Sequence, residues 1–133
     1  MTACGLWPAR HGLVAVVADD DGRGGTAIGV ALNDDARWGL LVHLEATQGL
    51  DCELVLPEDL LRDSIAHLAV ERGLPAYLAP RTLVEAIRTV AGLTTGPPRR
   101  TALMLARLPL SPALRAFLRP LRRSNNASQL HLL

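Results

Sequence analysis

The chain of 133 residues contains no lysine, four aromatic residues and two cysteines. With so few aromatic side chains, leucine, valine and alanine must fill the core of what the length indicates is one domain. Cys4 and Cys52 lack the spacing of metal ligands, so we expect two free thiols. No apolar run reaches the roughly 18 residues of a membrane span, and no secretory signal pattern is present. These absences predict a cytoplasmic protein with no membrane association and no bound cofactor.

Acidic residues are missing from the last third of the chain. Residues 1–66 carry eleven acids and four arginines, whereas residues 67–133 carry two acids and ten arginines, although the net charge is only +1. From residue 86 onward there are eight arginines and no acid. Charge separated in this way favours either a polyanion partner or a head-to-tail contact between two copies of the chain.

Three strand-like runs joined by two short turns follow one another in the first half. The runs are residues 13–19, 26–32 and 38–46, and the turns are rich in aspartate, asparagine and glycine. Connections this short allow only antiparallel neighbours. The pattern therefore predicts a three-stranded meander in which residues 38–46 form the third strand.

Helical and strand patterns alternate in the second half. We expect helices over residues 57–73, 81–92, 99–108 and 111–123, and a fourth strand over residues 74–80. The order β-β-β-α-β-α predicts an α/β fold with a ribonuclease H-like mixed sheet, strand order three-two-one-four, and extra C-terminal helices. We expect one domain over residues 1–123, including a C-terminal basic helix, and a flexible tail over residues 124–133.

Two short motifs carry a family resemblance. The segment "VADDDGRGGTAIGVAL" is similar to a family's first strand, which ends in Gly-Ile-Asp before a hairpin, and "LEATQG" matches its Glu-Ala-Thr-Gly motif. Over residues 13–108 the chain resembles the amino-terminal RuvC-like domain of Piv-type DEDD transposases and DNA invertases. The resemblance implies DNA strand cleavage by two Mg²⁺ or Mn²⁺ ions held between four carboxylates, with Asp19 and Glu45 in the first two positions.

The final motif of that family departs from the pattern here. The segment "GPPRRTALMLAR" places Pro98 and Thr101 where the family has two aspartates, and arginines lie between them. In the predicted sheet Asp19 and Glu45 would also lie two strands, or about 10 Å, apart. We therefore name no catalytic or metal-binding residue and treat Asp19 and Glu45 as relics, with a solvated turn and a surface strand position as their simplest roles.

Arginines also recur at helical spacing near the C-terminus. In a helix over residues 111–123, Arg115, Arg119 and Arg122 would line one face, and Leu114, Phe117 and Leu118 would lie opposite. We name these three arginines as nucleic-acid-binding residues, through guanidinium-phosphate contacts. A solvated basic face, or a contact with the acidic half of a second copy, explains the same pattern.

Three functions stay open. The first is a catalytically degenerate ribonuclease H-like domain that serves binding or assembly, linked to the DNA transactions of a mobile element. The second is an active nuclease or transposase-like enzyme that depends on Mg²⁺ or Mn²⁺ and takes missing carboxylates from elsewhere, for example Asp51 or Asp63. Only this alternative implies a metal cofactor. The third is a self-associating protein without a nucleic-acid role. We favour the first, without enzymatic activity, and expect a homo-oligomer or weak, non-specific binding to DNA.

Overall fold

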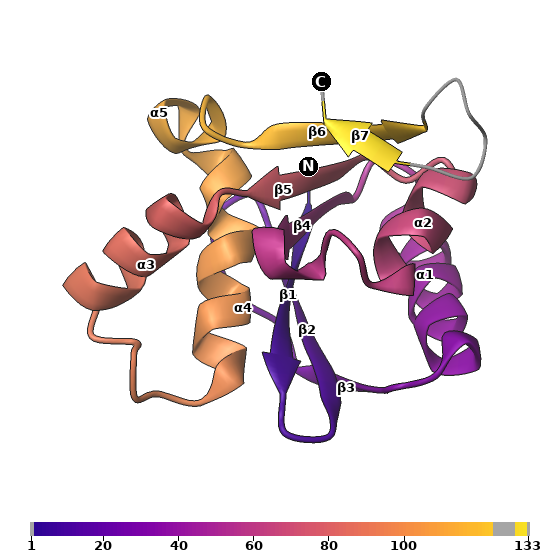
Figure 1. The fold of residues 1–133 in the computed structure, drawn as a ribbon, viewed down its shortest axis with the longest axis horizontal. Coiled ribbons are helices and arrows are strands. Elements are labelled where there is room, and N and C mark those ends of the chain that lie inside the picture. Colours follow the sequence, from indigo (N-terminus) through magenta and orange to yellow (C-terminus); the bar gives the residue numbers. More distant parts are fainter. Residues whose placement is uncertain (1, 124–129, 133) are drawn as a thin grey trace.

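A seven-stranded mixed sheet forms the centre of the protein in the computed structural model, which describes residues 2–123 and 130–132 (Figure 1). Its order is β3-β2-β1-β4-β5-β6-β7. The first three strands are antiparallel neighbours, β1, β4 and β5 run parallel, and β6 and β7 are antiparallel additions. The strands are β1 (Ala3–Ala9), β2 (Gly12–Ala18), β3 (Ile28–Ala31), β4 (Glu53–Pro57), β5 (Ala76–Ala79), β6 (Arg119–Arg123) and β7 (Leu130–Leu132).

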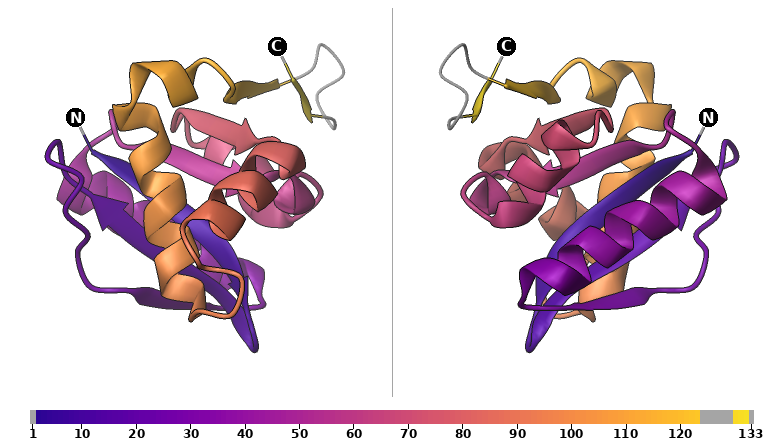
Figure 2. Two further views of the ribbon diagram at one scale, coloured as in Figure 1. Left: turned by 90° about the vertical axis from the view of Figure 1, so that its left-hand side faces the viewer. Right: turned by 90° about the vertical axis from the view of Figure 1, so that its right-hand side faces the viewer.

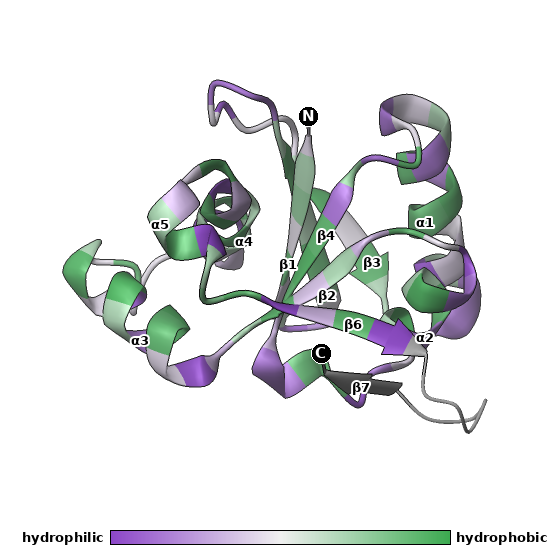
Figure 3. Cartoon of the chain, turned by 90° about the horizontal axis from the view of Figure 1, so that it is seen from above, coloured by the Kyte–Doolittle hydropathy of each residue, from purple (hydrophilic) through white to green (hydrophobic). Residues whose placement is uncertain are grey.

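Helices cover both faces of the sheet and make three layers (Figures 1 and 3). The helices α1 (Asp34–Gln48) and α2 (Ser64–Glu71) cover one face, and α3 (Arg81–Val90) and α4 (Pro98–Arg107) cover the other. In the described part of the chain, none of the helices combines the length and the apolar character that crossing a bilayer requires. The short helical turns are η1 (Glu58–Leu60), η2 (Leu108–Leu110) and α5 (Pro112–Arg115).

Alternating side chains of the strands divide the core between the two layers of helices. On β4, Leu54 and Leu56 pack with α1 and α2, whereas Val55 packs with α3 and α4. All three side chains are almost completely buried. This pattern is expected of a parallel strand that is covered on both faces.

Gly5 allows α4 to pack directly on the backbone of the central strand β1. A Cβ atom at Gly5 would lie 1.9 Å from the carbonyl oxygen of Ala102 and 2.7 Å from the amide nitrogen of Ala106. Ala102 and Ala106 are themselves fully buried. The three small residues therefore fix the distance between the first strand and α4.

The predicted mixed α/β fold class is confirmed, and several predicted elements are confirmed with it. The strands predicted over residues 13–19, 26–32 and 74–80 correspond to β2, β3 and β5. The helices predicted over residues 81–92 and 99–108 correspond to α3 and α4.

The third strand predicted over residues 38–46 is wrong, because these residues belong to α1. The side chain of Asn33 caps this helix by accepting a hydrogen bond from the Ala36 amide at 2.7 Å, and Asp34 and Asp35 follow in its first turn. Leu40, Leu41 and Leu44 are buried at helical spacing. A buried helix and a buried strand can both read as an apolar run, and here the N-terminal cap decides between them.

Four of the described strands, β1, β4, β6 and β7, were absent from the prediction. The central strand β1 forms a hairpin with β2, and β4 precedes η1. The predicted neighbours are wrong for this reason. The prediction placed residues 13–19 beside residues 74–80, whereas β1 and β4 lie between these two segments, which are β2 and β5. In the numbering of the structure, the first four strands nevertheless follow the order three-two-one-four. The helix predicted over residues 57–73 begins only at Ser64, where the Asp63 side chain accepts a hydrogen bond from the Ile65 amide.

The predicted helix over residues 111–123 is also wrong. Its first turn is α5, but the chain then extends into β6, where Leu121 joins the core on the side of α1 and α2. Proline cannot donate the amide hydrogen bond of a helix interior, and Pro120 lies opposite Tyr77 of β5 instead. In the predicted tail, residues 130–132 form β7, and residues 124–129 and 133 lie outside the described part of the chain.

Candidate functional site

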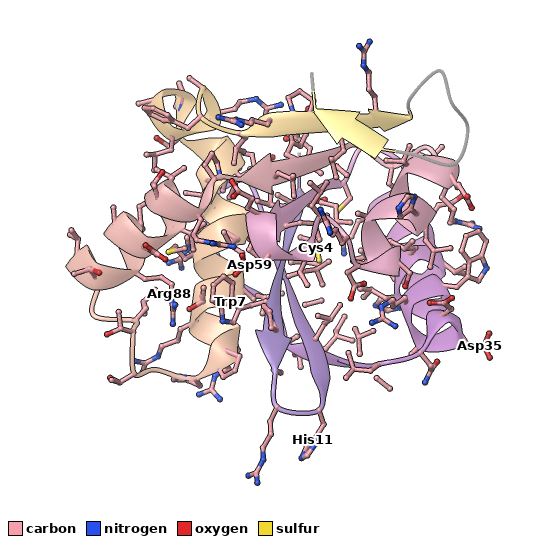
Figure 4. All side chains as sticks on the ribbon, in the orientation of Figure 1. Cys4, Trp7, His11, Asp35, Asp59 and Arg88 are labelled. Carbon is pink, nitrogen blue, oxygen red and sulfur yellow. The ribbon has the colours of Figure 1, made fainter. Side chains whose placement is uncertain are left out.

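The carboxyl ends of the parallel strands β1, β4 and β5 meet at one edge of the sheet, which is where open α/β sheets bind ligands. Trp7 lies near the end of β1, Glu58 and Asp59 follow β4, and Arg81 follows β5. With Glu85 and Arg88 of α3, among others, they line a cavity of about 120 Å³. We define this set of side chains as the carboxyl-edge cluster, of which Figure 4 labels Trp7, Asp59 and Arg88.

Trp7 and Arg88 occupy the centre of the carboxyl-edge cluster. The guanidinium carbon of Arg88 lies 4.8 Å from the centroid of the Trp7 ring, which is cation-π distance. Nη2 of Arg88 donates to the carbonyl oxygen of Leu93 at 3.5 Å. Its Nε is buried, and among the described atoms it has no hydrogen-bond acceptor. The stack covers the end of β1 with an aromatic ring and a cation.

Asp59 is the carboxylate of this cluster that has a fixed partner. Nε of Arg81 donates to Oδ1 of Asp59 at 3.0 Å, and Nη2 bonds the same oxygen. These hydrogen bonds and the negative charge of Asp59 raise the pKa of Arg81 above its usual range. Asp59 is therefore an ion-pair partner of Arg81.

The donor set at this edge does not fit a pair of divalent metal ions. Among the described residues, no group of three or more histidine, cysteine, aspartate or glutamate side chains is placed to hold a metal ion. The strand β1 carries no carboxylate at its end, and Pro98 and Thr101 lie in the first turn of α4, the helix packed on β1.

Asp19, the first relic residue, lies at the opposite edge of the sheet. Ala18, which precedes it, is the register partner of Ala3 at the beginning of β1. A strand of seven residues spans about 20 Å, so Asp19 is far from the carboxyl end of β1. Its Oδ1 accepts hydrogen bonds from the backbone amides of Asp21 and Arg23 at 3.0 and 2.9 Å. Asp19 thus organises the turn after β2, in agreement with the simpler interpretation of this motif.

Glu45, the second relic residue, belongs to α1 and forms an ion pair with Arg72 next to α2. Nε of Arg72 donates to its Oε2 at 2.7 Å. His43 is exposed on the same helix, and residues two apart on a helix do not share a face, so His43 and Glu45 do not lie side by side. Of the proposed substitute carboxylates, Asp63 binds Arg37 at 2.8 Å and Asp51 is exposed.

Arg115 binds a buried carboxylate that the sequence analysis did not single out. Its Nη1 and Nη2 donate to Oε1 and Oε2 of Glu53 at 2.7 and 2.6 Å, and Tyr77 lies beside them. The hydrogen bonds from Arg115 are the main cause that lowers the pKa of Glu53, and burial raises the pKa of Tyr77. Arg115 therefore fastens α5 to the beginning of β4.

The predicted basic helix face does not exist. Arg119 and Arg122 lie on β6, three residues apart, so their side chains leave opposite faces of a strand. Arg115 is on a different element and points to Glu53.

The sequence did contain a signal for the residues that were missed. "ACGLWPA" and "GLVAVVA" are two apolar runs separated by Arg10 and His11, which is the pattern of a hairpin. His11 lies at the tip of that hairpin (Figure 4). Recognising it would have placed Trp7 at the end of the central strand.

Comparison with known proteins supports the fold. No family model matches the chain, and no curated protein does. A solved structure, RuvC of T. thermophilus in complex with a Holliday junction substrate, superposes with a TM-score of 0.54. The two sequences are 17% identical, and the match covers 87% of this chain and 94% of that one. The chain therefore has a ribonuclease H-like fold.

Proposed function

We propose that this chain is a non-catalytic ribonuclease H-like domain that binds the phosphate backbone of nucleic acid. One observation carries the proposal. In the first turn of α4, Pro98 and Thr101 stand where the transposase resemblance implies aspartates, and Arg99 and Arg100 are exposed between them. The exchange removes ligands for a metal ion and adds two groups that bind phosphate directly.

The charges of Arg99 and Arg100 are not balanced inside the molecule. In the part of the chain that the structure describes, no carboxylate lies within ion-pair distance of either side chain, whereas Arg37, Arg72 and Arg115 each have one. Cations in the first turn of a helix are also opposed by the helix dipole. An anion bound there would neutralise the two unpaired positive charges and would interact favourably with the helix dipole.

A hollow beside these arginines has room for a phosphate group. It measures about 190 Å³ and is lined by Arg99, Arg100 and by Gly24 and Gly25 of the loop after β2, among others. Glycine lets a ligand approach the backbone closely. The solved RuvC structure holds a Holliday junction, so DNA is the first polyanion to test. The resemblance to transposases makes a mobile element the expected setting, and the cytoplasm remains the proposed location.

Arg119 and Arg122 remain proposed contacts for a longer DNA, because they lie on β6, a different element from α4. Arg115 is omitted, because Glu53 occupies its guanidinium group.

Binding to fluorescently labelled four-way and duplex DNA, measured by anisotropy over a salt series, tests the proposal. Weak, sequence-tolerant binding is expected, with a log-log slope of about −0.9 per phosphate contacted. The R99A/R100A variant should flatten the slope by about 2, and Arg62→Ala, which lies before α2 on the other side of the sheet, should leave it nearly unchanged. No binding at low salt, or an unchanged slope in the double variant, contradicts the proposal.

A cleavage assay tests the non-catalytic part. DNA incubated with the protein in Mg²⁺ or Mn²⁺ should remain intact. Cleavage that disappears in Asp59→Asn would show that the carboxyl-edge cluster is an active site after all.

A further inference from the structure

An apolar groove lies between α3 and α4, on the side of the sheet away from α1. Its cavity of about 430 Å³ is within the usual range for binding sites. Its walls are mainly apolar, with Ile87, Ala91, Leu93, Leu103, Met104 and Leu108.

Two arginines flank this groove along α4. Arg100 and Arg107 are seven residues apart, about 10.5 Å along the helix axis, and Leu103 and Met104 lie between them. Nε of Arg107 donates to the carbonyl oxygen of Gly22 at 2.6 Å, and its terminal nitrogens remain available as donors. No acid occurs in the sequence from residue 86 onward, so the groove walls carry only positive charge. The groove therefore suits an apolar surface that carries an acidic side chain beside it.

The chain itself has such a surface on α1, on the opposite side of the molecule (Figures 1 and 2). Trp38 and Val42 are 39% and 40% exposed, and Leu50, just beyond the helix, is 55% exposed. Asp35 precedes them, pointing away from the body of the protein (Figure 4), and Asp51 follows them. In the described chain neither aspartate has an ion-pair partner. We call these five residues the α1 stripe.

The α1 stripe follows one side of the helix. Asp35, Trp38 and Val42 are three and four residues apart and so share a face. Arg72 covers one side of the Trp38 ring at 4.6 Å, but its charge is held by Glu45. The stripe therefore presents apolar residues between two unpaired carboxylates.

We propose that the α1 stripe of one copy of the chain docks into the α3-α4 groove of a second copy. Apolar side chains meet apolar walls, and Asp35, beside Trp38, faces the arginines of α4. Arg100 and Arg107 are about 10.5 Å apart, whereas α1 continues for about 20 Å beyond Asp35, so Asp51 lies outside this pairing. The two surfaces differ and lie on opposite sides of the molecule, so the contact is head-to-tail and builds a ring or a filament, not a two-fold dimer. The groove and the proposed phosphate hollow share Arg100, so assembly and DNA binding would use the same side chain, whereas Val42 and Ala91 lie outside the hollow.

Sedimentation velocity with complementary variants tests the proposal. Val42→Glu places a charge in the stripe, and Ala91→Glu places one at the lip of the groove. Both positions are exposed. Wild type should form species larger than a dimer as concentration rises, and each variant alone should associate at least about tenfold more weakly. Phe117→Glu, at an exposed apolar position outside both surfaces, should behave as wild type.

Mixing the two variants gives the decisive result. The intact groove of V42E can accept the intact stripe of A91E, so a one-to-one dimer that cannot extend should appear. Monomeric wild type at all concentrations, unaffected variants, or a mixture that stays monomeric would each overturn the proposal. Circular dichroism checks folding, and Asp35→Lys, an exposed charge reversal, replaces Val42→Glu if that variant loses helix content.

Discussion

Arg88 stacks on Trp7 where the central strand β1 ends, with the guanidinium carbon 4.8 Å from the ring centroid. The resemblance to DEDD transposases implies a carboxylate at the end of the first strand. An aromatic ring under a cation can neither bind a divalent ion nor activate water. A ribonuclease H-like fold does not by itself imply nuclease chemistry.

Removing Arg115 should destabilise the domain. Arg115→Ala leaves the buried Glu53 carboxylate unpaired, and we expect the free energy of unfolding in urea at pH 7 to fall by about 2–3 kcal/mol. Arg119→Ala, at an exposed position of β6, should change it by less than about 0.5 kcal/mol. Equal effects of the two substitutions would exclude a special role for the ion pair.

The effect of Arg115→Ala should depend on pH. The folded protein holds the pKa of Glu53 below its ordinary value of 4.5, so the pair stabilises the fold above that pH. As pH falls below 4.5, the unfolded chain takes up a proton at Glu53 first and the folded protein only at lower pH, so the stabilisation is lost over that interval. The difference between wild type and variant should therefore shrink in acid, and a difference that is constant with pH would contradict this account.

Gly5 and Gly39 should respond in opposite directions to alanine. At Gly5 a methyl group would collide with the backbone of α4, and we expect a loss of about 3 kcal/mol or failure to fold. At Gly39, in α1, nothing lies within 4 Å of the added Cβ, and the better helix propensity of alanine should increase stability by up to about 1 kcal/mol. Thermal unfolding of both variants measures the contrast, and similar effects would be inconsistent with the packing described.

Both thiols should be inert in the native protein. Cys4 and Cys52 are buried free cysteines, and burial raises the pKa of both. A thiol reagent such as DTNB should find almost no reactive group in the folded protein and two in denaturant. Rapid reaction of either thiol under native conditions would show that the central strands open readily.

Asp19 should matter through hydrogen bonds and not through charge. Asp19→Asn keeps an oxygen that can accept the amides of Asp21 and Arg23, whereas Asp19→Ala removes it and should cost about 1 kcal/mol. Calorimetric titration with Mn²⁺ should give no binding for wild type or Asp19→Asn. A metal affinity that Asp19→Asn abolishes would show that Asp19 still contributes to a metal site.

The fold class could be predicted although its elements were shifted along the chain. The prediction missed β1 and took α1 for a strand. These two errors cancel in the count, so three strands still precede the first predicted helix. The strands at residues 13–19 and 74–80 were clear because their apolar runs are short and lie between turn residues. The Asn33 cap was the available signal for α1, since local hydrogen bonding there outweighs the strand-like run of Leu40 to Leu44.

The candidate site was less predictable, because it depends on which strand is central. With β1 missed, Trp7 had no assigned position and Asp19 took the role of the strand-end carboxylate. Arg88 and Asp59 reach the site from α3 and from the segment after β4, and no local pattern links either one to Trp7. Only the parallel pairing of β1, β4 and β5 brings them together.

The contact of Gly5 with Ala102 also constrains how the chain folds. The strand β1 lies inside the sheet, and α4, which covers it, comes about 100 residues later in the sequence. The contact between Gly5 and Ala102 therefore joins two segments that are far apart along the chain. Such non-local contacts slow folding, since the entropy of closing a long loop is lost before they form. On a ribosome, β1 would be synthesised before α4, and the face of β1 that carries Gly5 would stay exposed until α4 emerges. The Ala102 region is therefore where we expect nascent chains to commit to the native state.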